Sequence, residues 1–445
     1  MFFHNIYCKI KNSMLYLVSV HFYILEWCFL KTILEKSKKE SIDFSSTVDY
    51  MVERITTIVE EIGPRAPGSK EELKAQEFMG EDLKQWSDDI TIEEFTVHRQ
   101  AFMGFIPFTV AMALAATVLY WLEFPLVGFL CTVLGIVPLV LEFLMYKRFL
   151  DPLFKGHPSH NLIATKKPKG EIKKRIIFIG HADSQYEWIL NYLLGGTGMK
   201  LFLIPAAVGL FVVCFASLIK YFTYLNLDDP SKGVDTFFFI VGIILCLFVV
   251  PYFGFLFFQS YTKSVPGAND NLTGCLTVMS ILKLMKENNI EFENTEIRIL
   301  LTGSEEAGLR GAKNYAETHE DELKSIETVV IACDTMRDLK DMAVYDRDLS
   351  GTLKHDRQAK ELVNRAAKNC VYDLPYASIY LGACSAAAFT QKKIKATGFA
   401  AMDPTPPRYY HTRLDTPDLL VPEALEVGAK VLLETACLYD SEGLI

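Results

Sequence analysis

Four long apolar segments stand out against an otherwise mixed pattern of hydrophobic and polar positions in this chain of 445 residues. They cover residues 102–121, 125–146, 201–219 and 236–258. Each is close to the roughly 20 mostly apolar residues that a membrane-spanning helix needs. Buried core helices are the alternative, but such helices seldom stay apolar on every face over this length. The pattern therefore predicts four membrane-spanning helices.

The four segments pair into two hairpins, which we expect over residues 101–146 and 200–259. The first hairpin turns at Leu122–Phe124, and the second turns across the polar stretch Tyr221–Asp235. Because a hairpin returns the chain to the side that it left, the flanking residues share one side of the membrane. We expect these flanking residues to form one soluble domain, from residues 45–100, 147–199 and 260–445.

Charges near the segment ends predict the side on which the soluble domain lies. The far loops carry two basic residues, Lys220 and Lys232, whereas the soluble side carries six. The six are Arg99, Lys147, Arg148, Lys155, Lys200 and Lys263. Since basic residues favour the cytoplasmic side, we expect an integral protein of the plasma membrane with a cytoplasmic soluble domain. Scattered cysteines without a CxxC pair agree with a reducing compartment.

Residues 1–44 form a separate N-terminal stretch, and its apolar part is Met14–Leu30. This part contains His21 and Glu26 and lacks the small-residue cleavage site of a signal peptide. A fifth span, an interfacial helix and an incorrectly assigned start of the chain all fit this stretch. A fifth span would put the N-terminus opposite the soluble domain.

The rest of the chain alternates between helical and strand patterns. Helical periodicity predicts helices over Thr47–Ile62, Lys70–Trp86, Cys275–Lys286, Ala307–Thr318, Asp356–Lys368 and Pro422–Leu438. Short β-rich runs predict strands over Lys174–Gly180, Thr295–Leu301 and Thr328–Ala332. Alternation of this kind indicates an α/β fold, a central sheet flanked by helices.

Charge and one missing motif exclude two classes of protein. The net charge is −9, which argues against a nucleic-acid binder because phosphate contacts need a basic face. The His-Glu-x-x-His signature of many zinc proteases is absent, because His319-Glu320 has no second histidine at the required spacing.

Polar side chains gather directly after three predicted strands. His181 and Asp183 follow the first strand, Glu305-Glu306 follows the second, and Asp334 follows the third. Ligands in open α/β sheets bind at the carboxyl ends of the strands. These residues therefore indicate a metal site at one edge of the sheet.

Each motif has an alternative interpretation when it is taken alone. The Glu305-Glu306 pair is commonly solvated, and Asp334 is also a suitable helix N-cap. The run Gly267-Ala268-Asn269-Asp270-Asn271 has the composition of a turn. His411 with Asp415 fits a capped histidine in a loop. The order of the motifs along the chain is more specific than any single one.

That order is His-x-Asp, Gly-Ala-x-Asp-Asn-x-x-Gly, Glu-Glu-x-Gly-Leu-x-Gly, Asp, and Tyr-His-x-x-x-Asp-Thr. It resembles the co-catalytic di-zinc aminopeptidase family, which includes bacterial leucyl aminopeptidases and glutamate carboxypeptidase-like exopeptidases. The run Gly63-Pro64-Arg65-Ala66-Pro67-Gly68-Ser69 is similar to the family's opening before its first long helix. The resemblance covers residues 45–100, 158–190 and 262–440. It implies a zinc exopeptidase fold, a mixed central sheet flanked by helices, here with two inserted transmembrane hairpins.

The resemblance also implies the metal ligands of two zinc ions. Asp270 bridges the two ions. His181 and Asp334 complete the first zinc site, and Glu306 and His411 complete the second. Imidazole and carboxylate are ligands that zinc takes readily, so these residue types suit the implied metal.

Three further roles follow from the resemblance. Glu305 is the general base on the water between the zinc ions and is not a ligand, while Asp183 orients His181. Tyr409 and Tyr410 are candidates for contacts with the substrate or the oxyanion. Ser385 is a third such candidate, and it stands where the family has an aspartate that does not bind metal. Metal binding should survive that departure, while substrate orientation can differ.

A second departure is the long insertion between His181 and Asp270, which contains the second apolar hairpin. Because the hairpin starts and ends close to two predicted ligands, we expect the catalytic mouth to face the bilayer. Apolar peptides or the tails of membrane proteins would then be substrates. The alternative is a tether that has no effect on substrate choice.

The leading hypothesis is a membrane-anchored zinc aminopeptidase that removes N-terminal residues from peptides. A carboxypeptidase or dipeptidase would use the same metal core. A glutaminyl cyclase-like acyltransferase, which usually operates with one zinc, and a catalytically dead receptor-like module are further alternatives, and the complete ligand set argues against both. A transporter is disfavoured because the spans contain no charged pathway beyond Glu142. The sequence gives no basis for an oligomeric state.

Overall fold

A mixed β-sheet forms the centre of the computed structural model, which describes residues 42–227 and 231–445. Within these residues the sheet has nine strands in the order β1-β2-β4-β3-β5-β9-β6-β7, and β8 pairs with β6. The strands are β1 Asp89–Val97, β2 His157–Lys166, β3 Lys174–His181, β4 Thr295–Thr302, β5 Glu327–Met336, β6 Met342–Asp348, β7 Leu353–Lys354, β8 Tyr376–Ser378 and β9 Lys395–Ala401. Thr47–Ile445 form one compact unit.

The central strands are parallel and covered on both faces. β3 pairs in parallel with β4 and β5, and β5 pairs in parallel with β9. Residues Arg175–His181 of β3 are all buried, as expected for a parallel strand inside a sheet covered on both faces. The antiparallel strands β1 and β2 extend the sheet on one side, and β6 extends it on the other.

Helices cover the two faces of the sheet. On one face, α9 packs on β3 and β5 beside α14, and α3 packs on β2. On the other face, α10, α11 and α13 share a core with alternate residues of β3, such as Ile177 and Ile179. The helices are α2 Ser45–Thr57, α3 Lys70–Leu83, α9 Thr273–Glu287, α10 Arg310–Thr318, α11 Glu320–Ser325, α12 Arg357–Asn369, α13 Ala386–Gln391 and α14 Pro422–Glu442. Short π- or 3-10 segments are Ile58–Ile62, Asp151–Leu153, Ala268–Leu272, Leu339–Asp341 and Pro417–Leu419.

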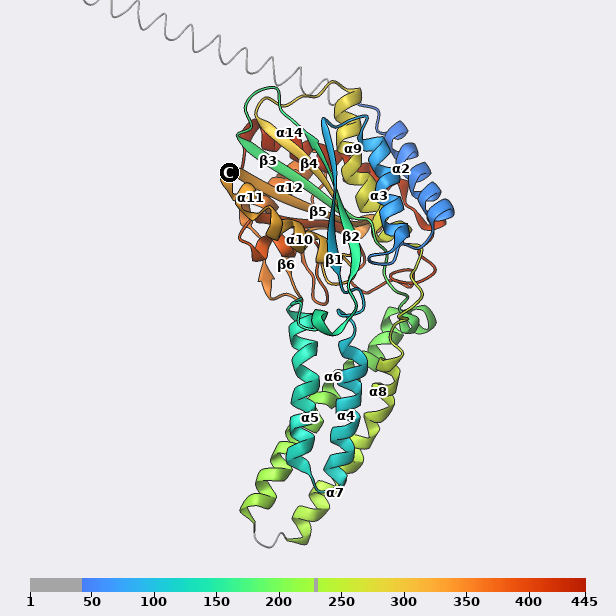
Figure 1. Ribbon diagram of the computed structural model, residues 1–445, viewed down its shortest axis with the longest axis vertical. Helices are drawn as coiled ribbons and strands as arrows, with labels where there is room; N and C mark the ends of the chain where they lie inside the picture. The colour runs from blue at the N-terminus through green and yellow to red at the C-terminus, as the bar shows by residue number, and fades with distance from the viewer. Residues whose placement is uncertain (1–41, 228–230) are drawn as a thin grey trace, which may run out of the picture. The chain divides into compact units, whose positions relative to one another are not determined.

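The apolar segments form helices that lie together below the sheet in Figure 1. They are α4 Phe105–Trp121, α5 Pro125–Pro138 with its continuation Leu139–Leu144, α6 Ile189–Asn226, α7 Lys232–Leu247 and α8 Val249–Leu256. Among the described residues, Pro125–Leu144, Ile189–Asn226 and Lys232–Leu256 are long and apolar enough to cross a membrane. The apolar helix α4 is shorter, at 17 residues.

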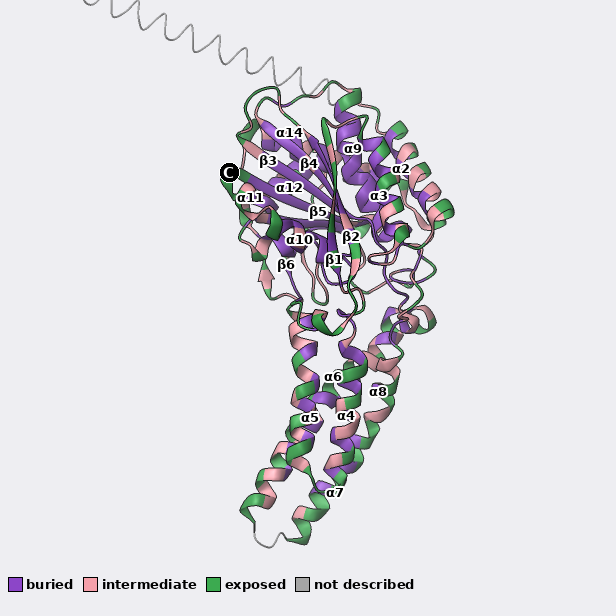
Figure 2. Cartoon of the chain, viewed as in Figure 1, coloured by how far each residue is buried: buried purple, intermediate pink, exposed green. Residues whose placement is uncertain are grey.

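The surface of these helices differs from that of the sheet domain. Figure 2 shows mostly buried strands, whereas the apolar helices leave much of their surface exposed. Leu201, Phe215 and Leu247 are 71%, 60% and 69% exposed. Large apolar side chains exposed in such number would be costly in water, which is consistent with a lipid environment.

Some predicted boundaries differ from the structure. α6 begins at Ile189, well before residue 201, but a kink at Gly195 (φ 69°, ψ 170°) divides it into a short first part and a long second part. The second part runs to Asn226 and α7 begins at Lys232, so the loop of the second hairpin is shorter than Tyr221–Asp235. The helix predicted from Ala307 begins at Arg310, because Glu305–Leu309 form a turn with Leu309 in a left-handed conformation. The apolar stretch Met14–Leu30 lies outside the described residues.

Glu142, in the continuation of α5, has a partner in the sheet domain although it belongs to an apolar segment. It is fully buried, and Arg310 of α10 donates to it and, at 2.7 Å, to Asp151. The second carboxylate oxygen of Glu142 accepts hydrogen bonds from the backbone N–H groups of Phe149 and Leu150, each at 2.9 Å. This ion pair fastens the end of the first hairpin to the helix that follows Glu305 and Glu306.

Substitution of Arg310 should reveal how much this junction contributes to stability. Arg310→Ala leaves the Glu142 carboxylate buried without its ionic partner, which should lower the free energy of unfolding by about 3–5 kcal/mol. The measurement is denaturant unfolding of the full chain in detergent.

Arg148→Ala is the matched control. Arg148 also binds a carboxylate, that of Glu317 at 2.8 Å, but the two side chains are 38% and 43% exposed. Its loss should therefore cost no more than about 1 kcal/mol. Equal losses from the two variants would contradict a special role for the buried pair.

Candidate metal centre

The carboxyl ends of the parallel strands bring together the polar residues singled out in the sequence. His181 ends β3, Asp334 lies near the end of β5, and Glu305-Glu306 lies in the turn after β4. The segment Ala268–Leu272 adds Asp270, and the loop before residue 417 adds His411. Five of these side chains are buried, as expected for an internal cluster: those of His181, Asp270, Glu305, Glu306 and His411. The Asp334 side chain is 23% exposed.

Asp270 lies between the two histidines. Its Oδ1 is 3.3 Å from Nε2 of His181, and its Oδ2 is 2.8 Å from Nε2 of His411. Burial alone would raise the pKa of Asp270, but the hydrogen bonds with His181 and His411 hold it below its ordinary value. Asp270 therefore offers one ionised oxygen to each histidine.

Each histidine is close to a further carboxylate. Nε2 of His181 is 3.9 Å from Oδ1 of Asp334, and Nε2 of His411 is 3.2 Å from Oε1 of Glu306. Ligand atoms of His181, Asp270 and Glu306 lie within 4.8 Å of one another, as do those of His181, Glu305 and Asp334. The cluster can thus surround two neighbouring cations that share Asp270.

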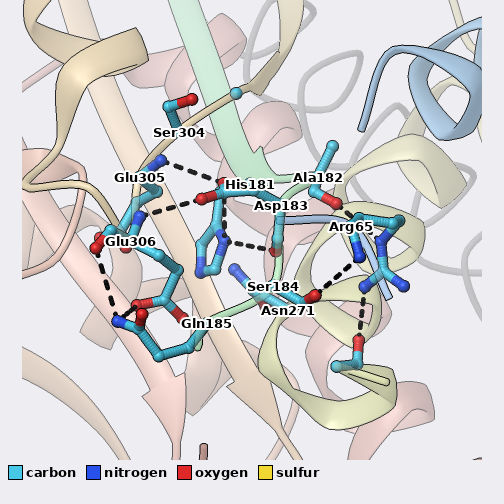
Figure 3. Close-up of polar contacts among 12 residues, drawn as sticks. Arg65, His181, Ala182, Asp183, Ser184, Gln185, Asn271, Ser304, Glu305 and Glu306 are labelled. Atoms are coloured by element: carbon cyan, nitrogen blue, oxygen red, sulfur yellow. Dashed lines mark hydrogen bonds and ion pairs between the residues drawn. The ribbon is translucent and has the colours of Figure 1, made fainter. Parts of the chain in front are cut away.

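Asp183 holds the backbone of Glu305 and Glu306 and lies beside the ring of His181. Its carboxylate accepts hydrogen bonds at 3.0 Å from the backbone N–H groups of both Glu305 and Glu306 (Figure 3). Its Oδ1 also lies 3.4 Å from Nδ1 of His181. One buried carboxylate therefore positions the imidazole and the backbone of both glutamates.

Two further residues, Asp415 and Gln185, hold parts of the cluster in place and are harder to recognise in the sequence. Asp415 accepts hydrogen bonds from the backbone N–H groups of Asn269 and Asp270, at 2.8 and 3.0 Å. Gln185 donates to Oε2 of Glu306 at 2.7 Å. Asp415 belongs to the Tyr-His-x-x-x-Asp-Thr motif and could have been found there, but Gln185 carries no motif. Such supports orient the groups that contact a metal.

Arg65 ties together two chain segments that flank the cluster. Its guanidinium donates to the carbonyl oxygens of Ala182, Pro266 and Gly267 at 2.7–2.8 Å, and part of this network is visible in Figure 3. Burial lowers the pKa of Arg65 to about 10, which still leaves it charged at neutral pH. The segments it joins lie just after His181 and just before Asp270.

Glu72 is a buried acid that the sequence did not single out. It accepts hydrogen bonds from the N–H and hydroxyl of Ser304 and from the hydroxyl of Ser159. Burial, followed by the charge of Asp183, raises the pKa of Glu72 to about 8. It holds the start of the turn that carries Glu305 and Glu306.

The electrostatics of the cluster fit a resident cation. Burial raises the pKa of Glu305 and Glu306 above the ordinary value, and that of Asp334 to about 7, with neighbouring carboxylates contributing. Oε1 of Glu306 is buried 3.2 Å from Nε2 of His411 but accepts no hydrogen bond of good geometry from the described residues. Two imidazoles and several carboxylates directed at one point are a donor set that zinc accepts.

The three candidates for substrate contacts lie in different surroundings. The Tyr409 hydroxyl donates to Asp338 at 2.8 Å, so the structure does not bring it to the cluster. Tyr410 stacks on the His411 ring with centroids 3.8 Å apart. The hydroxyl oxygen of Ser385 is buried and has no hydrogen-bond partner within the described part of the chain.

The second apolar hairpin begins and ends beside the cluster. Trp188, directly before α6, packs its ring 4.4 Å from that of His411 and donates its backbone N–H to the His411 carbonyl. Tyr186 and Ser264 form a β-bridge across the neck of the hairpin. The insertion is therefore part of the wall of the candidate site.

A second group of potential ligands is a closed hydrogen-bond network. Asp348, His355 and Cys384 lie close together and are buried. Asp348 binds the His355 ring at 3.2 Å, the Cys384 thiol at 3.1 Å and the backbone N–H of Leu349. The other ring nitrogen of His355 lies 2.8 Å from the Thr390 hydroxyl. Because these polar groups are hydrogen-bonded to one another, they can be buried without a metal ion.

Metal removal should expose the repulsion among the buried carboxylates. A chelator should lower the thermal unfolding midpoint of the full chain in detergent, and added zinc should restore it. Asp270→Asn removes the shared carboxylate, so this variant should bind less zinc in a metal assay and respond less to the chelator.

Asp356→Asn is the matched control, because Asp356 caps α12 and asparagine is an equally good N-cap. Its zinc content and its response to the chelator should equal those of the unmodified chain. A full response in Asp270→Asn would contradict the assignment of Asp270.

Comparison with known proteins finds a match to one family. Residues 256–436 match the peptidase family M28. A search of the curated proteins finds no match.

Solved structures share the fold. An aminopeptidase from Aneurinibacillus sp. strain AM-1 is 15% identical, with 89% of this chain and 94% of that chain covered and a TM-score of 0.51. BSAP, a zinc aminopeptidase from Bacillus subtilis, is 14% identical, with 90% and 96% covered and a TM-score of 0.53. A glutaminyl cyclase from Bacteroides thetaiotaomicron is 14% identical, with 88% and 97% covered and a TM-score of 0.50.

These comparisons confirm the predicted fold, a mixed sheet flanked by helices, and the prediction of a zinc-dependent peptidase. Residues 256–436 therefore resemble peptidase family M28, and the chain has the fold of the zinc aminopeptidases.

Proposed function

We propose that the chain is a membrane-anchored zinc aminopeptidase that removes N-terminal residues from peptides at the bilayer surface. The observation that carries this proposal is Asp270, whose two oxygens face His181 and His411, each of which has a further carboxylate nearby. The family match and the aminopeptidase neighbours support the reaction class.

Two zinc ions would share Asp270. His181 and Asp334 would complete one site, and Glu306 and His411 would complete the other. When bound, the ions supply Lewis-acid chemistry, which polarises a peptide carbonyl and lowers the pKa of water.

Glu305 would act as the general base. Burial raises the pKa of Glu305, and the charges of Glu306 and Asp334 raise it further, while His181 opposes the shift. A raised pKa suits a group that takes a proton from water and then returns it to the leaving amine. Asp183 would hold the base in position through the backbone N–H of Glu305.

A glutaminyl cyclase-like acyltransferase is the second candidate, because one structural neighbour is a glutaminyl cyclase. Such an enzyme would need a single zinc, whereas this chain retains carboxylates beside both histidines. The metal stoichiometry and the peptide panel described below separate the two activities.

The apolar helices would cross the bilayer as two hairpins and hold the sheet domain at its cytoplasmic face, in the plasma membrane. α4 has 17 residues, which is at the short end of the range for a spanning helix. Exposed apolar side chains also lie where the helices meet the sheet domain. Phe149, Leu153 and Leu193 are 47%, 77% and 60% exposed, and a lipid surface would cover them.

The base assignment is tested with Glu305→Gln. Loss of the proton acceptor should lower kcat by about 10²- to 10⁴-fold, while the zinc content stays that of the unmodified chain. Peptides with a free N-terminus should be cleaved, and the same peptides with an acetylated N-terminus should not.

Glu426→Gln, on α14, is the matched control and should keep full activity. Full activity in Glu305→Gln would overturn the mechanism. Cleavage of the acetylated peptides from their carboxyl end would assign a carboxypeptidase instead.

The position at the bilayer is tested with one peptide presented in two ways. In proteoliposomes, a peptide anchored by an acyl chain should be cleaved at least about 100-fold faster than the free peptide at equal total concentration, because anchoring raises its effective concentration. Detergent extraction should remove most of this preference. Equal rates for the two peptides, before and after extraction, would show that the hairpins only tether the enzyme and do not affect the choice of substrate.

A further inference from the structure

Tyr146 is the last residue of the first apolar hairpin, just after the helical segment Leu139–Leu144, and lies in the same hydrophobic cluster as the turn after Glu305. Its side chain is buried, and it shares a hydrophobic cluster with Leu309, from the turn after Glu305, and with Ala387, from α13. A Cβ built on Gly382 would lie 3.8 Å from the Tyr146 hydroxyl oxygen. The hydroxyl therefore faces the loop that carries Ser385.

The surroundings of Tyr146 fix its position from several sides. Its φ of 53° is left-handed, which is strained for an aromatic residue and persists only where the surroundings hold it. Lys313 of α10 donates to its carbonyl oxygen, and its ring lies 4.8 Å from that of Phe102. Strained residues of this kind concentrate at functional sites.

The hydroxyl of Tyr146 has no hydrogen-bond partner among residues 42–227 and 231–445. This differs from Tyr409, whose hydroxyl is taken by Asp338. Phe102, on which the Tyr146 ring packs, also lies against Gly308 in the turn after Glu305, since a Cβ built on Gly308 would lie 2.8 Å from the Phe102 ring. A donor without a partner among the described residues thus lies close to the turn that carries Glu305 and Glu306.

We propose that the Tyr146 hydroxyl donates a hydrogen bond to the peptide substrate beside Glu305, so that the first membrane hairpin supplies a residue of the active site. This inference rests on the proposed peptidase function. The proposed acceptor of this hydrogen bond is a carbonyl oxygen of the substrate backbone.

The chemistry of the site favours this role. A carbonyl oxygen needs a donor, and carboxylates such as Glu305 and Glu306 accept when they are ionised. The phenol of a tyrosine is protonated at neutral pH and is therefore a donor there. A neutral donor that is held rigidly in place can stabilise charge developing on a carbonyl oxygen.

The experiment uses Tyr146→Phe in the full-length chain, reconstituted with zinc. Phenylalanine keeps the ring packed on Phe102 and removes only the hydroxyl. We expect kcat/KM for a free-N-terminus peptide to fall by about 100-fold, with most of the loss in kcat. Zinc content and the thermal midpoint should remain those of the unmodified chain.

Tyr252→Phe is the matched control. Tyr252 lies in α8, and its buried hydroxyl has no hydrogen-bond partner among the residues that the structure describes. Its loss should leave kcat/KM unchanged. Unchanged kcat/KM in Tyr146→Phe would overturn the inference.

A binding measurement separates contact with substrate from a structural role. In a Glu305→Gln background, which should bind peptide without cleaving it, Tyr146→Phe should weaken peptide binding by about three- to tenfold. A lower thermal midpoint with unchanged peptide affinity would assign Tyr146 a structural role and overturn the inference. If the unmodified chain cleaves no peptide, the proposed function fails instead, and the two failures are thereby distinguished.

Discussion

Burial of acidic charge at the carboxyl ends of β3, β4 and β5 is the constraint on which the rest of the structure depends. Carboxylates so close together repel, and burial without compensation is costly. Hydrogen bonds offset part of this cost, because Asp183 and Asp415 each accept backbone N–H groups of the loops that carry Glu305 and Asp270. A bound cation would offset the remaining negative charge, which is the physical reason for regarding the cluster as a metal centre.

This constraint also determines how an apolar hairpin is accommodated between two site residues. His181 and Asp270 must keep their positions to fractions of an ångström, although α6 to α8 separate them in the chain. Arg65 joins the segments on both sides by donating to Ala182 and Gly267, and the Tyr186–Ser264 bridge closes the neck. The hairpin can therefore extend into another environment while its two ends remain part of a rigid loop system.

The sequence predicted the parts of the molecule that depend on local patterns. Buried strands such as β3, amphipathic helices such as α9 and the ordered motifs carry strong signals. The strands β1, β2, β6 and β9 were not predicted, because their identity depends on pairing with distant strands. Gln185 and Glu72 were missed for a similar reason, because each acts through a contact with Glu306 or Ser304 that only tertiary folding makes. Arg65 lies in the run that resembles the family's opening, but its contact with Ala182 could not be read from that run.

The two hairpins contribute to the site in different ways, which bears on why the chain would retain both. The second hairpin packs Trp188 against His411, so it supports a proposed ligand. The first is held by Glu142 and Arg310 to α10, whose N-terminus directly follows the turn of Glu305 and Glu306. A simple anchor would need only one apolar helix and no buried ion pair. Since replacing a buried ion pair by apolar groups often costs no stability, its presence at this junction favours a role in aligning the apolar helices with the candidate site.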